Sequence, residues 1–147
     1  MSGSGLATTL AVAAGLAGSV QVAIMSRLGE RIGAFQALGF ATLLTAVLSF
    51  VLLLATRSAA GYERALHQPW WMLMGGIAGL LIVFTVTYAG PRIGVAATVG
   101  ILIAGQLIMG AAIDRFGLFG SERISLHWPR VLGLLLLAAG AVLSLRK

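Results

Sequence analysis

The sequence contains no cysteine, and only 10% of its 147 residues are charged. The absence of cysteine excludes a disulfide scaffold, a thiolate metal site and a cysteine nucleophile. Charged residues make up about 25% of an ordinary soluble domain, so the low charge content excludes a soluble globular protein as well. Intrinsic disorder is excluded by the high hydrophobic content, because 59% of the residues are hydrophobic.

Acidic residues are also scarce, with four Asp and Glu against ten Lys and Arg, a formal charge of +6. In a soluble protein this basic excess would indicate a nucleic-acid partner. Here the charges lie between long apolar runs, and the mean hydropathy is +1.02. We therefore interpret them as charges that flank membrane spans, and we expect no nucleic-acid partner.

The distances between charges predict five transmembrane helices in a single transmembrane domain, residues 1–147. A hydrocarbon core about 30 Å thick needs roughly 20 helical residues. Four charge-free intervals hold 21 residues or more, whereas the fifth, between Arg130 and Arg146, holds only 15. We count it as spanning because Trp128, Arg130, Arg146 and Lys147 at its ends can snorkel. The fold class is therefore an all-α membrane protein of the cytoplasmic membrane, with helices at approximately 5–26, 33–56, 69–90, 93–113 and 129–146.

The connecting segments are predicted to be short. The first apolar stretch has neither a basic n-region nor an obvious processing site, so we expect a mature first helix rather than a cleaved signal peptide. Pro69 with Trp70 and Trp71 opens the third span, and Trp128 with Pro129 opens the fifth, which is typical of headgroup-level anchors. No extramembrane domain fits in the connections Arg27–Gly33, Arg57–Gln68, Pro91–Arg92 and Asp114–Arg130.

Basic residues are divided evenly between the two sides of the membrane that five spans define. A Lys and Arg tally of five against five gives the insertion machinery no instruction, which favours dual topology, with copies inserted both ways and paired antiparallel. A single orientation fixed by unequal weighting of positions remains the alternative, and a fifth segment that failed to span would make the tally seven against three. The first side holds Arg57, Arg64, Arg115, Arg123 and Arg130, and the second holds Arg27, Arg31, Arg92, Arg146 and Lys147.

Glycine is abundant, at 20 of 147 residues, and most glycines fall inside the predicted spans. Helices in lipid associate largely through small residues that let their backbones approach closely. We therefore predict helix-packing contacts at Gly18, Gly75, Gly79, Gly105 and Gly110.

No ionisable side chain lies deep within a predicted span. A mid-membrane carboxylate is therefore missing, and no nucleophile–base pair, metal cluster or cofactor motif is visible. This argues against an enzyme and against a bound cofactor or metal.

The polar groups at depth are two primary amides, Gln21 and Gln106. An amide without hydrogen bonds in hydrocarbon lowers stability by about 1–3 kcal/mol, so each of the two needs hydrogen-bond partners. Either they bond a neighbouring helix, or they line a cavity and bind a polar solute. In the second case the substrate site would also include hydroxyls that rank lower, because helical hydroxyls often bond their own backbone. These are Ser19, Tyr88 and Thr98, with Thr85 and Thr87 as further neighbours.

Asp114 is the acid nearest the membrane path, at the end of the fourth predicted span. Local pairing with Arg115 is the simpler interpretation. If transport is coupled to protons, Asp114 is the candidate acid.

Several motifs, in order along nearly the whole chain, resemble the YdcZ-like half-length (five-helix) branch of the drug/metabolite transporter superfamily. One position departs from the family pattern, since Met25 stands where an asparagine is expected four residues after Gln21. The motifs are Pro69-Trp70-Trp71, Gly75-Gly76, Pro91-Arg92-Ile93-Gly94, Gly105-Gln106-Leu107-Ile108 and Ile113-Asp114-Arg115-Phe116-Gly117-Leu118-Phe119-Gly120.

This resemblance implies an antiparallel homodimer in the lipid bilayer that forms a ten-helix inverted-repeat transporter for a small organic solute, working by alternating access. A small channel built by the same assembly, and a non-transporting membrane subunit, are the alternatives.

Overall fold

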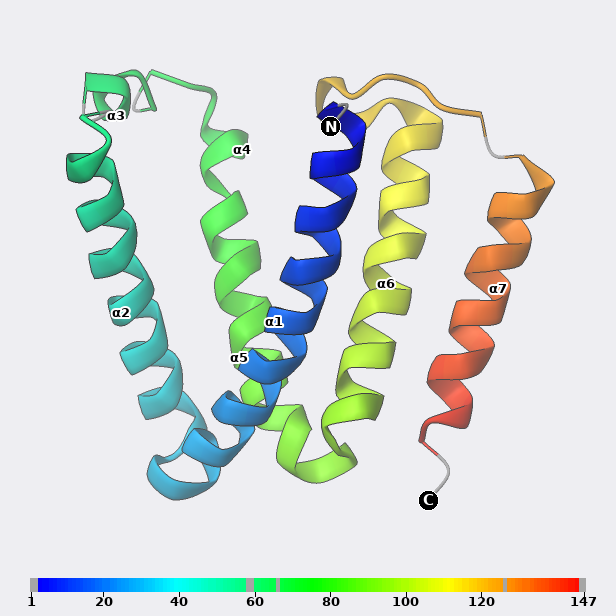
Figure 1. The fold of residues 1–147 in the computed structure, drawn as a ribbon, viewed down its shortest axis with the longest axis horizontal. Coiled ribbons are helices and arrows are strands. Elements are labelled where there is room, and N and C mark those ends of the chain that lie inside the picture. The colour runs from blue at the N-terminus through cyan, green and yellow to red at the C-terminus, as the bar shows by residue number, and fades with distance from the viewer. Residues whose placement is uncertain (1–2, 58–59, 66, 126, 146–147) are drawn as a thin grey trace. The chain divides into compact units, whose positions relative to one another are not determined.

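The computed structural model describes residues 3–57, 60–65, 67–125 and 127–145, and every regular element in these ranges is a helix (Figure 1). Residues 146 and 147, which we expected to end the fifth helix, lie outside the described part. The elements are α1 (Gly3–Ile32), α2 (Ala34–Ala55), α3 (Ala60–Ala65), α4 (Trp70–Leu73), α5 (Gly75–Ile93), α6 (Val95–Phe116), the 3-10 turn η1 (Leu118–Gly120) and α7 (Trp128–Leu143).

Four helical segments are long and apolar enough to cross a membrane: Ser4–Ile32, Ala34–Ala55, Trp70–Ile93 and Val95–Phe116. The third combines α4 and α5, which Met74 joins without a change of direction, since Ala78 N–H donates to the Met74 carbonyl at 3.1 Å. The fifth predicted helix is present as α7, an apolar helix of 16 residues. At 1.5 Å per residue it is about 24 Å long, shorter than a hydrocarbon core of about 30 Å.

Helix ends differ from the predicted ones where charge was used to place them. α1 continues through Arg27 and Glu30 to Ile32, because these residues are good helix formers and pair with each other one turn apart. α5 continues through Pro91 to Ile93. Two glycines make the actual breaks: Gly33, with φ 95° and ψ 149°, and Gly94, with φ 90° and ψ 155°. Both conformations are ones that residues with a Cβ rarely adopt.

The described chain falls into two compact units. The first unit contains residues 3–23 and those from 92 onward, and the second contains residues 24–91. In the first unit α6 and α7 lie side by side and antiparallel (Figure 1). A Cβ added to Gly100 of α6 would lie 3.7 Å from the Ala141 Cα of α7, so glycine and alanine set this close approach.

In the second unit the end of α1 crosses α5 at Gly29. A Cβ there would lie 2.7 Å from Thr87 Cγ2 and 3.2 Å from the Thr87 carbonyl oxygen. Pro91 has no N–H to offer the Thr87 carbonyl, so the regular four-residue helix hydrogen bond to that oxygen is missing. At the start of α2 the Phe35 ring packs on Phe84 of α5, with ring centroids 5.1 Å apart.

The buried hydrophobic core is made of few and mostly small side chains, whereas large apolar side chains cover the outside of every long helix. So much exposed apolar surface is incompatible with water and is normal for helices that face lipid or another membrane chain. The buried hydrophobic residues in the described part are Val22, Met25, Ala37, Val86, Ala97, Ala111 and Ala141.

Candidate functional site

The two amides lie on different helices of the first unit. Gln21 is on α1 and Gln106 is on α6, and both side chains are exposed. Neither amide forms a hydrogen bond with another described residue. Pairing with a neighbouring helix therefore does not occur within the described chain, and the donors and acceptor of each amide are left for a second chain, water or a solute.

The two amides occupy equivalent positions along their helices. Each lies twelve residues from the glycine that closes its helical corner, Gly33 for Gln21 and Gly94 for Gln106. At 1.5 Å per residue this is about 18 Å along the helix, roughly half the length of a membrane-spanning helix. If consecutive spans alternate in direction, as predicted, the two amides are expected at similar depths.

The predicted hydroxyl ligands already bond their own helices. The Ser19 hydroxyl donates to the Gly15 carbonyl at 3.3 Å, and the Thr98 hydroxyl, which is buried, donates to the Gly94 carbonyl at 2.8 Å. Thr85 and Thr87 behave in the same way. These hydroxyl hydrogens are occupied, so only the oxygen lone pairs could accept from a solute.

Tyr88 belongs to the second unit. Its ring stacks on Phe84, with centroids 6.0 Å apart, and this pair continues the Phe35–Phe84 contact into a short aromatic row. The ring remains half exposed, at 47%. The row could stack a planar solute, but the placement of Tyr88 beside the two amides stays a prediction, because it lies in the other unit.

Asp114 lies in the last turn of α6 and forms an ion pair with Arg130 of α7. Its backbone carbonyl also accepts the Ile124 N–H at 2.9 Å, which folds the connecting segment back over the helix end. The expected local partner, Arg115, is therefore replaced by a residue sixteen positions further on. Spacing along one helix could not reveal this pair, because it depends on the antiparallel return of α7.

The glycines predicted to pack helices do not do so within the described chain. A Cβ at any of these five positions would have no described heavy atom within 4 Å, apart from its own helix backbone and adjacent residues. Close contacts occur instead at Gly29 and Gly100. A packing contact with a helix of a second chain stays a prediction for the other five glycines, which are Gly18, Gly75, Gly79, Gly105 and Gly110.

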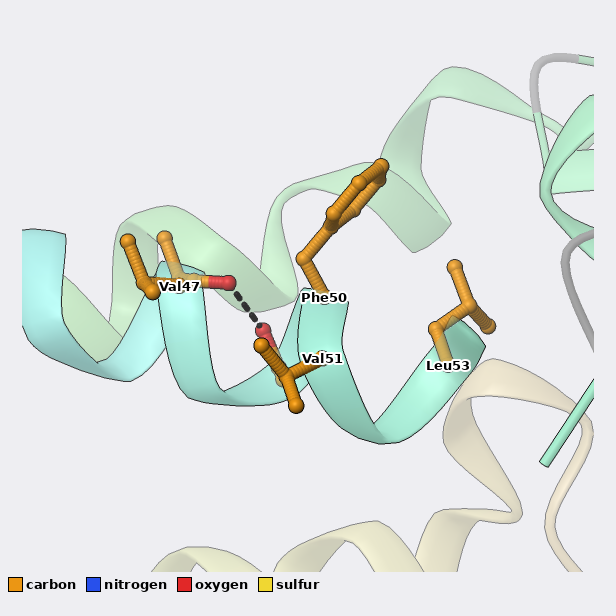
Figure 2. A pocket seen from close by; sticks show the side chains of 6 residues that line it. Val47, Phe50, Val51 and Leu53 are labelled. Atoms are coloured by element: carbon orange, nitrogen blue, oxygen red, sulfur yellow. Dashed lines mark hydrogen bonds between the residues drawn. The ribbon is translucent and has the colours of Figure 1, made fainter. Parts of the chain in front are cut away.

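Apolar hollows lie in both units of the described chain. One, of about 330 Å³, lies between α6 and α7 and has Gly100, Gly140 and Ala141 on its wall. The other, of about 580 Å³, lies along α2, where Val47, Phe50, Val51 and Leu53 spread around a single helix (Figure 2). Neither hollow includes Gln21 or Gln106. Among the described residues, no group of His, Cys, Asp or Glu could hold a metal ion.

Long apolar helices, a small buried core and large apolar side chains on the outside of the helices are the features of a multi-pass membrane protein. The chain belongs to the family described as "Putative inner membrane exporter, YdcZ", whose profile matches residues 6–143. It is 30% identical over 138 residues to the Inner membrane protein YdcZ of Escherichia coli (strain K12), covering 92% of each chain. No solved structure matches it.

Family membership confirms the predicted resemblance and the location in the inner membrane. It also assigns the chain to a class of transporters rather than to a class of enzymes.

Proposed function

We propose that the chain is one half of a small-solute transporter and that an inverted second copy supplies the other half. Two copies then enclose a cavity near the middle of the membrane, and alternating access opens that cavity to each side in turn. α7 counts as the fifth span in this arrangement, with its ends extended by Trp128, Arg130 and the basic C-terminus.

The observation that carries this proposal is the pair of amides at one depth without partners in the described chain. An inverted copy places four such amides at the middle of the assembly, where they can orient a polar solute through donors and acceptors. Ser19, Thr98 and Tyr88 would add weaker polar contacts, and apolar wall residues would exclude water.

The even division of Lys and Arg supports insertion in both directions. Five basic residues fall on each side when five spans are counted, so neither orientation is favoured. Asp114 would be the coupling acid if protons drive transport, because release from Arg130 would free its carboxylate to bind a proton.

The test starts from the purified protein. A thermal-shift screen of small metabolites and cationic amphiphiles identifies compounds that raise the melting temperature, since a ligand of the folded state stabilises it. The compound found is then followed in proteoliposomes. Saturable uptake with counterflow supports the transporter, whereas a flux too fast for a conformational cycle contradicts it and favours a channel.

A further inference from the structure

The structure contains two copies of one helical corner. Arg31-Ile32-Gly33 joins α1 to α2, and Arg92-Ile93-Gly94 joins α5 to α6, 61 residues later. The two glycines have φ and ψ values within about 6° of each other, well inside the usual scatter of a regular element. Each glycine carbonyl accepts the N–H four residues on, at 3.0 Å in both corners.

The same 61-residue spacing relates the helices on both sides of the corner. In the proposed topology, where consecutive spans alternate in direction, the α1–α2 and α5–α6 hairpins form a parallel repeat. Identical residues at this spacing are Gly15 and Gly76, Gly18 and Gly79, Val22 and Val83, Gly29 and Gly90, and Gly39 and Gly100. Buried positions correspond as well: Met25 and Val86, Ser26 and Thr87, and Ala37 and Thr98.

The repeat reveals one helix face that lacks its equivalent neighbour. Gly100 and the buried Thr98 lie on opposite faces of α6, and α7 covers the face that carries Gly100. On α2 the equivalent face carries Gly39, opposite buried Ala37, and no described atom beyond its own helix and adjacent residues lies within 4 Å of a Cβ built there. The chain offers only one α7. α2 is accordingly the least buried span, at 6% of its most apolar window against 17% for α6.

Side-chain size alternates along this face of α2. Gly39, Leu43, Ala46 and Phe50 follow at intervals of four, three and four residues, so they share one side of the helix. Leu43 and Phe50 are 65% and 56% exposed. Ala46 and Phe50 border the hollow along α2 (Figure 2). We call these four residues the α2 face.

The order of the α2 face fits an antiparallel copy of itself. The four residues are centred between positions 44 and 45, which is also the midpoint of Ala34–Ala55. Two such helices that pack antiparallel at equal depth place Phe50 against Gly39 and Leu43 against Ala46, large against small at every level. A parallel pair would place Phe50 on Phe50 and leave a void between two glycines.

We propose that the α2 face binds the α2 face of an inverted second copy, as the contact between the halves of the assembly. This inference rests on the inverted pair proposed above and names the surface that joins it. The contact is isologous, because both copies use the same face, so each pair of a large and a small residue occurs twice. The α2 helix of the second copy is then the antiparallel neighbour of α2, as α7 is the antiparallel neighbour of α6.

Cysteine cross-linking in native membranes tests the pairing, and the cysteine-free chain provides a clean background. Gly39→Cys and Phe50→Cys are expressed separately and together, then treated with an oxidant or a short thiol linker. The inference predicts a cross-linked dimer when the two variants are mixed and little from either alone. Ala41→Cys with Leu48→Cys is the control, because these two positions would also lie at one level of an antiparallel pair but are on the opposite face, so they should not cross-link.

Strong cross-linking of Gly39→Cys with itself would show a parallel pair and overturn the inference. Absence of the mixed cross-link would overturn it too, and in that case lipid or another part of the second copy covers the face. If a cysteine in the α6–α7 connection is reached from both sides of the membrane while the α2 pairs stay unlinked, the inverted pair stands and only this surface is wrong.

A size exchange gives a second readout. Gly39→Phe alone should reduce the dimer seen in mild detergent, because Phe would meet Phe50 of the partner chain. The double variant Gly39→Phe with Phe50→Gly restores large against small in an antiparallel pair and should restore the dimer. Equal loss in the single and double variants would contradict the pairing.

Discussion

A primary amide near the middle of a membrane has two donors and an acceptor to satisfy. Gln21 and Gln106 find no partner in the described chain, although leaving such a group unpaired in hydrocarbon costs about 1–3 kcal/mol. The hydroxyls nearby avoid this cost by bonding their own helices. These two amides therefore remain available to a solute or a second copy.

Replacing Gln106 by Leu should abolish uptake in proteoliposomes while leaving the oligomer intact. Leucine is similar in size but has no donor or acceptor, so a polar solute loses its orienting contact. Gln68→Leu makes the same chemical change outside the spans and should leave uptake unchanged. Uptake by the Gln106→Leu protein at the normal rate would show that this amide is a packing group.

The Asp114–Arg130 ion pair ties the end of α6 to the start of α7. The two side chains are 27% and 39% exposed, so solvent screens the pair and it should contribute only about 0.2–1 kcal/mol. We expect Arg130→Gln to lower the melting temperature slightly. Exchanging the charges, Asp114→Arg with Arg130→Asp, should recover most of the loss, since the attraction is restored. A double variant no more stable than the single one would contradict a direct pair.

Helix ends in this chain are set by backbone geometry more than by charge. The charge spacing predicted the four long spans, because hydropathy and length decide which segments can cross a membrane. It placed the first and third ends several residues early, since Arg27, Glu30 and Pro91 are all accommodated inside helices. The positive φ of Gly33 and Gly94 makes the breaks, and a sequence shows glycine without showing its φ.

The crossing of α1 and α5 depends on the missing Cβ of Gly29. Gly29→Ala should lower the free energy of unfolding by about 1–3 kcal/mol, as overpacking does, because its Cβ would lie 2.7 Å from Thr87 Cγ2. Thr87→Ser removes that methyl group and keeps the hydroxyl bond to the Val83 carbonyl, so the double variant should regain part of the loss. Thermal unfolding in detergent measures both.

Gly15→Ala is the control in the same helix, because no described atom outside its helix backbone and adjacent residues lies within 4 Å of that position. It should be neutral or mildly stabilising, as alanine is the better helix former. A loss as large as that of Gly29→Ala would show that glycine matters for reasons other than this contact.

The described part of the chain buries little apolar surface, which agrees with the proposed half of a transporter. Its buried hydrophobic residues are few and mostly small, and its two amides lack partners. Sequence reasoning found these amides because polar residues are conspicuous in apolar spans. It could not identify Arg130 as the partner of Asp114, or Gly29 as a contact point, because these depend on how helices return and cross.

Orientation should respond to small changes in the basic residue count. Gln68→Lys with Ser121→Lys adds two basic residues to the side that carries the α2–α4 and α6–α7 connections. We expect nearly all copies then to insert with that side in the cytoplasm, since Lys and Arg set orientation. Glu at the same two positions should leave the distribution unchanged, because acids contribute little. Insensitivity to the lysines would argue that other features fix the orientation.

The central claim, a transporter completed by an inverted copy, is tested most directly by two-sided labelling of one cysteine. Ser125→Cys lies in the exposed α6–α7 connection and changes no charge. A membrane-impermeant maleimide should label part of the population in intact cells and the remainder only after permeabilisation. Labelling of every copy from a single side would contradict the inverted pair.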